Sequence, residues 1–151
     1  MQRCLLLIWI FTFHVTILPA QGLDSVEWNF TSKRLDDKTY EVRISAEMEY
    51  PWHIYSQYTK DGGPLPTDIV FTDNPAIELE GEIKEEGGLI EKYEELFMVD
   101  TSYYIGRVDF IQRVKVKKET PQVLKGSVTF MACTDKQGLT PQQVEFNIKL
   151  N

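Results

Sequence analysis

Short runs in which apolar and polar residues alternate constrain the fold of this chain more than any other feature. Tyr40, Val42, Ile44 and Ala46 alternate with polar residues, and similar runs occur at 26–31, 77–83, 108–116, 128–133 and 144–150. Turn-forming residues separate these runs, at 36–38, 61–64, 73–75, 85–88 and 117–121. A period of two places successive side chains on opposite faces of a strand. No run after residue 22 keeps a helical period for three turns, so the pattern predicts eight or nine short strands in an all-β, antiparallel β-sandwich.

The first 20 residues are typical of a secretory signal peptide. Arg3 gives a positive start, residues 4–17 are mostly apolar, and Pro19-Ala20 precedes Gln21-Gly22. We expect cleavage after Ala20, or alternatively after Gly22. The apolar run of about 14 residues is shorter than the roughly 20 that a spanning helix needs, which disfavours a membrane anchor. The expected organisation is a signal peptide at 1–20 and one exported domain at 21–151, with no membrane insertion after cleavage.

The charge of the expected mature chain excludes some classes of partner. Without Arg3, 15 basic residues stand against 23 acidic ones, so the net charge is −8. Binding to nucleic acid or to anionic lipid surfaces needs a basic surface instead. The sequence therefore predicts neither a nucleic-acid partner nor charge-driven membrane binding, and it leaves the oligomeric state open.

Cys133 is the only cysteine of the expected mature chain, because Cys4 lies in the signal peptide. It ends the alternating run 128–133 and precedes a polar turn that closes at Pro141. Exported proteins usually carry paired cysteines, and a single thiol cannot form an internal disulfide. Cys133 must therefore be buried, capped, reactive or joined to another molecule.

Two segments resemble the N-terminal periplasmic domain of the thiol:disulfide interchange protein DsbD. The segment 131–141, Met-Ala-Cys-Thr-Asp-Lys-Gln-Gly-Leu-Thr-Pro, matches the first active cysteine of that family, the acidic residue after it and the second of two prolines. It departs from the pattern at Gly138, where the second cysteine is expected, and at Thr140, where the first proline is expected. The run 52–57, Trp-His-Ile-Tyr-Ser-Gln, resembles domains of this family in Bacteroidetes-like bacteria. The resemblance implies an immunoglobulin-like sandwich exported to the periplasm.

The resemblance also implies roles for individual residues. Cys133 is the candidate catalytic residue. In the family, a loop with an aromatic residue caps the active cysteines until a partner docks, and Phe97, or second Tyr93, is the candidate in the segment 87–105, which is the least strand-like part of the chain. His53 and Tyr55 fall where family members place residues near the thiols, and being two apart on a strand they share a face. Either could tune the thiol pKa, or both could be ordinary sandwich and surface residues.

Asp135 fits two roles equally well, as a residue that forms the turn and as a proton acceptor. A carboxylate close to a cysteine raises the pKa of the thiol. Gly138 removes the resolving thiol that two-thiol exchange requires, so the full reductase cycle of the family fails and enzymatic activity is uncertain. No cofactor is expected, and the soft donors Met48, Met98, Met131, His53 and Cys133 lack the close spacing of a copper site.

Three functional hypotheses follow. The first is a periplasmic DsbD-like domain that docks thioredoxin-like proteins or a separate membrane electron-donor domain, with single-cysteine or degraded redox chemistry at Cys133, and it predicts a partly exposed thiol. The alternative is a redox-silent, secreted immunoglobulin-like binding module. The third is an ordinary secreted β-sandwich enzyme or carbohydrate-binding domain, for which no motif places paired carboxylates.

Overall fold

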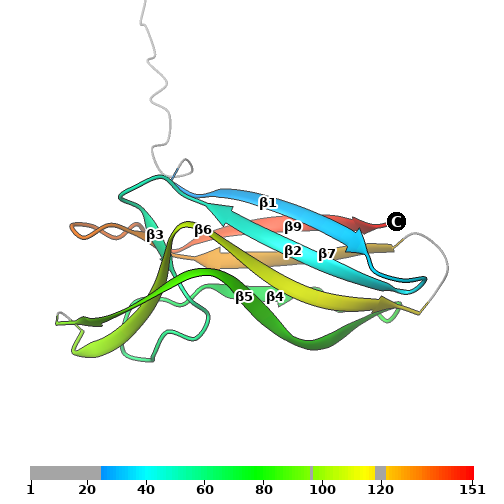
Figure 1. The fold of residues 1–151 in the computed structure, drawn as a ribbon, viewed down its shortest axis with the longest axis horizontal. Helices are drawn as coiled ribbons and strands as arrows, with labels where there is room; N and C mark the ends of the chain where they lie inside the picture. The colour runs from blue at the N-terminus through cyan, green and yellow to red at the C-terminus, as the bar shows by residue number, and fades with distance from the viewer. Residues whose placement is uncertain (1–24, 96, 118–121) are drawn as a thin grey trace, which may run out of the picture.

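The computed structural model describes residues 25–95, 97–117 and 122–151 (Figure 1). That part of the chain contains strands and no helix, so it holds no helix that could span a membrane. The predicted signal peptide, residues 1–20, lies outside the described residues. The strands are β1 (Glu27–Arg34), β2 (Thr39–Glu47), β3 (His53–Tyr55), β4 (Asp68–Phe71), β5 (Ile77–Glu94), β6 (Val99–Val116), β7 (Gln122–Phe130), β8 (Ala132–Cys133) and β9 (Gln142–Leu150).

The strands form two antiparallel sheets, so the predicted all-β antiparallel sandwich is confirmed. The larger sheet has the order β1-β2-β6-β3-β8, with β5 on the other edge of β6, and the smaller has the order β4-β7-β9. Figure 1 shows β1 and β2 in front of β9 and β7, with the long β5–β6 hairpin extending past them. The alternation in the sequence sets the buried face, because Tyr40, Val42, Ile44 and Ala46 of β2 are all at most 6% exposed.

The core lies between the sheets and is rich in aromatic and branched side chains. Phe110 of β6 and Phe130 of β7 are almost completely buried, and the ring of Trp28 packs against both, with centroids 6.2 Å and 5.1 Å away. Phe30 stacks on Phe146 across the two sheets at 5.1 Å. Full burial of a phenylalanine side chain contributes about 1.5–3 kcal/mol, so Phe110, Phe130 and Phe146 each stabilise the sandwich by an amount of this order.

The strand β6 bends in its middle and changes its neighbour there. Residues 107–115 pair with β2, whereas residues 103–105 pair with β3. Gly106 stands between the two segments with a φ of +74°, a conformation that favours glycine. The partner strand β5 shifts its register at the same level, between Gly87 and Leu89. The outer half of the β5–β6 hairpin therefore pairs with β3, which in turn pairs with β8, whereas the inner half pairs with β2.

Three local expectations from the sequence are wrong. The segment 85–88 is not a turn, and 87–105 is largely strand, because β5 continues to Glu94 and β6 begins at Val99. A Cβ on Gly87 would lie 3.0 Å from the carbonyl oxygen of Arg107 and 3.1 Å from the Tyr104 ring, so this glycine serves close packing within a strand. The run 128–133 is two strands, since the chain leaves one sheet after Phe130 and enters the other at Ala132.

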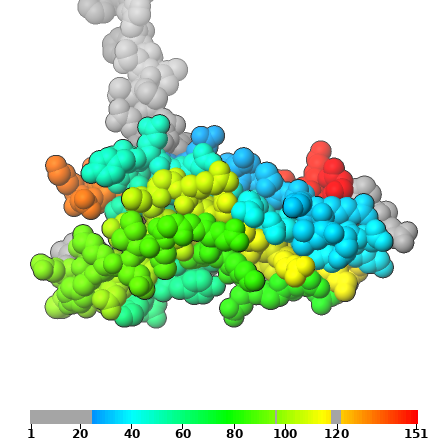
Figure 2. Space-filling view, in the orientation of Figure 1, coloured from blue at the N-terminus to red at the C-terminus, as the bar shows by residue number. Residues whose placement is uncertain are grey.

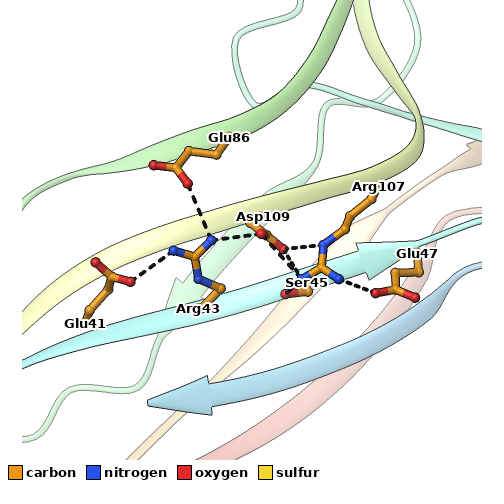
Figure 3. A network of polar contacts seen from close by, with 7 residues as sticks. All are labelled: Glu41, Arg43, Ser45, Glu47, Glu86, Arg107 and Asp109. Carbon is orange, nitrogen blue, oxygen red and sulfur yellow. Dashed lines mark hydrogen bonds and ion pairs between the residues drawn. The ribbon is translucent and has the colours of Figure 1, made fainter. Parts of the chain in front are cut away.

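A polar network covers part of the outer face of the larger sheet (Figure 3). Arg43 of β2 contacts Asp109 of β6 at 2.8 Å, Glu41 at 3.0 Å and Glu86 of β5 at 3.4 Å. Arg107 contacts the other oxygen of Asp109 at 3.1 Å and also reaches Glu47. One carboxylate thus joins two arginines, and the network links β2, β5 and β6.

Candidate thiol site

Cys133 is held at the edge of the larger sheet by two short strands. It lies opposite His53 in the register of β8 with β3, and Ala132 lies opposite Ile54. After Cys133 the chain turns back, with hydrogen bonds from Thr134 N to Gln137 O (2.7 Å) and from Leu139 N to Ala132 O (2.9 Å). The polar turn expected after Cys133 is therefore present, and it places Gly138 in a bridge directly opposite Cys133.

His53, Tyr55 and Cys133 form one buried cluster, with exposed fractions of 8%, 7% and 7%. The Tyr55 hydroxyl lies 3.3 Å from Nε2 of His53, and Tyr55 and Cys133 each influence the pKa of the other. Tyr103 of β6 completes the cluster with its ring 4.7 Å from the His53 ring. The expectation that His53 and Tyr55 share a face is confirmed by this contact, and the alternative of a surface histidine is wrong.

Burial determines the protonation of the thiol. Burial raises the pKa of Cys133, and the ability of Tyr55 to donate a hydrogen bond to the ionised sulfur opposes that effect without reversing it. Burial likewise lowers the pKa of His53, while the negative charge of Asp135 works in the opposite direction. At neutral pH both groups are therefore mainly uncharged, and the thiolate that attacks disulfides must be generated in the site.

Cys133 lies in the wall of an open cleft with a volume of about 440 Å³. One side of the cleft comes from the β5–β6 hairpin, with Lys92, Glu94 and Phe97, and another from Pro64 and Leu65 of the β3–β4 connection. The residues of the turn after Cys133 complete it. Figure 1 shows the hairpin tip and the orange turn after β8 at the same end of the molecule, and Figure 2 shows both on its surface.

Gly138 lies where a second thiol would meet Cys133. A Cβ built on Gly138 would be 3.1 Å from the Cys133 sulfur and 3.8 Å from the sulfur of Met131. In a disulfide, the Cβ of one cysteine lies about 3 Å from the sulfur of the other, as follows from the S–S length and bond angles. The backbone therefore has the spacing for a disulfide at 133–138, but the chain has only one of the two sulfurs.

The structure brings most of the predicted site residues together. Cys133, His53, Tyr55, Asp135, Gly138 and Phe97 all line the same cleft. Tyr93 does not, because it points from the opposite face of β5, is 56% exposed and lies near Tyr58 and Lys60. The partly exposed thiol of the first hypothesis is not observed, since only 7% of Cys133 is exposed.

Sequence reasoning missed Tyr103, Lys92 and Glu94, which face the thiol cluster from the hairpin. The alternation of Ile90, Lys92 and Glu94 would place them on one face of a strand, but only if 87–105 had been predicted as a hairpin. It also missed Glu85, whose carboxylate accepts hydrogen bonds from Ser56 Oγ at 2.6 Å and Tyr104 OH at 2.7 Å. This carboxylate fastens the hairpin to the residues that follow β3.

The described residues hold no group of three or more His, Cys, Asp or Glu side chains that could bind a metal ion. Independently of that, the cleft contains one thiol with a tyrosine and a histidine beside it. Such a site can form and release a mixed disulfide, but it cannot close an internal one.

Structural comparison identifies the class of fold. The N-terminal periplasmic domain of ScsB from Proteus mirabilis superposes with a TM-score of 0.59 at 14% identity, over 88% of this chain and 49% of that one, so this chain spans about half its length. The reduced DsbD N-terminal domain of Neisseria meningitidis gives a TM-score of 0.51 at 17% identity, over 81% and 85% of the two chains.

The DsbD N-terminal domain from the same organism, in a structure of its complex with the PilB N-terminal domain, gives a TM-score of 0.50 at 14% identity over 87% and 86%. No family is matched by the sequence, and no curated protein is significantly similar to it. At these identities the likeness establishes the fold alone. The chain has the immunoglobulin-like sandwich of DsbD and ScsB N-terminal domains, as expected, and the ScsB domain is a periplasmic one.

Proposed function

We propose that this chain is an exported, periplasmic docking domain for thioredoxin-like proteins, which it captures through a reversible mixed disulfide at Cys133. The observation that carries the proposal is the position of Cys133, in the wall of an open cleft and opposite Gly138. The fold adds support, because a DsbD N-terminal domain forms a complex with the PilB N-terminal domain. The membership of residues 1–20 in a signal peptide is part of the same proposal.

The capture step conserves electrons. The Cys133 thiolate attacks the disulfide of the partner, one partner sulfur joins Cys133, and the other leaves as a thiolate that takes up the proton lost by Cys133. The second cysteine of the partner then attacks the mixed disulfide and restores both proteins. No net reduction occurs, so the chain holds its partner transiently through a covalent bond and does not act as a reductase.

Phe97 is the proposed cap of this site. It stands at the turn of the β5–β6 hairpin, is 40% exposed and lines the cleft that contains Cys133. A movable apolar side chain there shields the thiol from oxidants while no partner is docked.

A redox-silent binding module is the second candidate function. Burial of Cys133 and its raised pKa favour it, because a protonated, buried thiol is a poor nucleophile. In this alternative the same cleft and hairpin bind a partner without a covalent step, and Cys133 only packs against Tyr55 and Gly138.

One experiment separates the two functions. The mature chain is mixed with a thioredoxin-like protein whose second active-site cysteine is replaced by alanine and whose first is activated as an aromatic mixed disulfide. We expect a covalent one-to-one complex that a reducing agent dissolves and that Cys133→Ser abolishes. Equal non-covalent binding by wild type and Cys133→Ser, with no covalent product, would support the redox-silent module. Absence of both complexes would exclude both functions.

A further inference from the structure

A continuous chain of side chains connects the thiol to a histidine. Cys133 and His53 lie directly opposite each other on β8 and β3, and Tyr55 is two residues farther along β3 on the same face. The Tyr55 hydroxyl meets His53 Nε2 at 3.3 Å, and Tyr55 also lies close enough to Cys133 for each residue to act on the pKa of the other. All three residues are at most 8% exposed, so water cannot readily replace any of these contacts.

The backbone beside His53 favours one tautomer of its ring. The backbone of Pro51, which can only accept a hydrogen bond, acts on the His53 ring in favour of the protonated form. Nε2 faces Tyr55, so Nδ1 is the nitrogen left for Pro51, and the relay requires the tautomer that carries its hydrogen on Nδ1. Nε2 of the neutral ring then has a free lone pair directed at the Tyr55 hydroxyl.

We propose that His53 is the general base that takes the proton of Cys133 through the hydroxyl of Tyr55. This inference rests on the proposed function, since it explains how a buried thiol becomes a thiolate when a partner docks. In the resting state the Cys133 thiol donates to Tyr55, and Tyr55 donates to Nε2. On activation the Cys133 proton moves to the Tyr55 oxygen while the Tyr55 proton moves to Nε2.

Every group keeps a hydrogen bond after this transfer. The protonated Nε2 of His53 donates to the Tyr55 oxygen, and the Tyr55 hydroxyl donates to the Cys133 thiolate. The thiolate attacks the sulfur of a bound disulfide, a new S–S bond forms and the old one breaks. The leaving thiolate receives the proton that His53 holds, so protons and electrons balance.

The groups around His53 favour a neutral ring at rest and also stabilise the protonated ring that forms on activation. The titratable and charged groups that face it come from each neighbouring element: Tyr55 on β3, Lys92 and Glu94 on β5, Tyr103 on β6, Cys133 on β8, and Asp135 in the turn after β8. Burial keeps the ring neutral at rest, with Lys92 acting in the same sense. Asp135 and Glu94 favour the protonated ring that forms on activation.

The test measures the rate at which 4,4′-dithiodipyridine reacts with Cys133 across pH in the folded mature chain. The variants are Tyr55→Phe and His53→Ala, and the matched control is Tyr93→Phe, which removes a tyrosine hydroxyl from the same end of the molecule but outside the cleft. We expect both variants to slow the reaction at neutral pH by about 10²-fold, the lower end of the usual effect of general bases. Tyr93→Phe should react like wild type.

The pH profile distinguishes a proton relay from a packing role. Wild type should show a low-pH inflection from His53 that both variants lack, and the rates of wild type and Tyr55→Phe should converge in alkali, where the thiol ionises without help. Added imidazole should restore the rate of His53→Ala by entering the space left by the ring. Circular dichroism establishes that each variant is folded.

Three results would overturn the relay: an unreactive thiol in folded wild type, a Tyr55→Phe rate equal to wild type at neutral pH, or a loss of rate that is uniform across pH. The last two leave the proposed docking function intact, because the covalent complex with a thioredoxin-like protein is measured independently. A reactive, relay-dependent thiol that captures no such protein would reject the function and retain the relay.

Discussion

At the scale of single residues, Gly138 explains most about the chemistry of this chain. It forms a bridge with Cys133, and its missing Cβ would lie 3.1 Å from the Cys133 sulfur. The backbone of the turn does not require a glycine at this position, because the φ of Gly138 is not positive, whereas Gly62, Gly81 and Gly106 have positive φ angles. A side chain can be placed there at the cost of a small shift of the sulfur.

We predict that Gly138→Cys forms an internal disulfide with Cys133. The spacing of Cβ and sulfur is already close to the roughly 3 Å of a disulfide, so little backbone movement is needed. Mild oxidation should remove both free thiols and lower the mass by two hydrogens. Lys136→Cys at the exposed tip of the same turn is the matched control and should keep two free thiols. Similar oxidation of both variants would contradict the proposed geometry.

At the scale of strands, the network around Asp109 joins β2, β5 and β6 (Figure 3). Burial raises the pKa of Asp109, but hydrogen bonds from Ser45, Arg43 and Arg107 outweigh burial and leave the pKa below its ordinary value. The folded state therefore holds the carboxylate ionised more strongly than the unfolded chain does. This contribution to stability is complete above the unfolded pKa of 3.8 and is lost as pH falls through the lower folded value.

We predict that Asp109→Asn lowers the free energy of unfolding by roughly 1–2 kcal/mol at neutral pH, since hydrogen bonds to two partly exposed arginines weaken. The difference from wild type should shrink below about pH 4, because the unfolded wild-type chain then takes up a proton at Asp109, and it should vanish at the lower pH where folded Asp109 is protonated too. Urea unfolding at a series of pH values measures both effects. Asp100→Asn, in the exposed ion pair with Lys60, is the control and should change stability little. A pH-independent difference for Asp109→Asn would contradict this role.

Alternation was sufficient to predict β1, β2 and β9, because each has one face on the core and one toward solvent. It failed for the outer hairpin, where neither face is covered by a second sheet and the burial pattern of β5 is mostly exposed. The pair Gly87-Gly88 indicated a turn, whereas Gly87 is required by the nearby Tyr104 ring. The shared face of His53 and Tyr55 follows from local spacing. Their contact with Cys133 depends on the β3–β8 register, which the sequence alone does not specify.

At the scale of the whole molecule, the sandwich places three distant segments at one end. The β3 strand, the turn after β8 and the outer β5–β6 hairpin all border the cleft, opposite the C-terminus in Figure 1. The hairpin is fastened to the rest by Glu85, by the ion pair of Lys60 with Asp100 at 2.6 Å, and by contact of Val99 with Gly63. Its tip carries Phe97 and Met98, which are 40% and 76% exposed. The end that contains the thiol is therefore also the end with an exposed apolar tip.

We predict that Phe97→Ala increases the rate at which iodoacetamide alkylates Cys133 in the folded chain. If the half-exposed phenyl ring contributes about 1 kcal/mol to keeping the tip over the cleft, the open state and the rate should rise about fivefold. Tyr93→Ala is the matched control, because Tyr93 occupies the same hairpin but faces away from the cleft. Mass spectrometry of timed samples gives both rates. Equal rates for Phe97→Ala and wild type would show that Phe97 does not cap the thiol, whereas acceleration by Tyr93→Ala alone would assign the cap to the other aromatic residue.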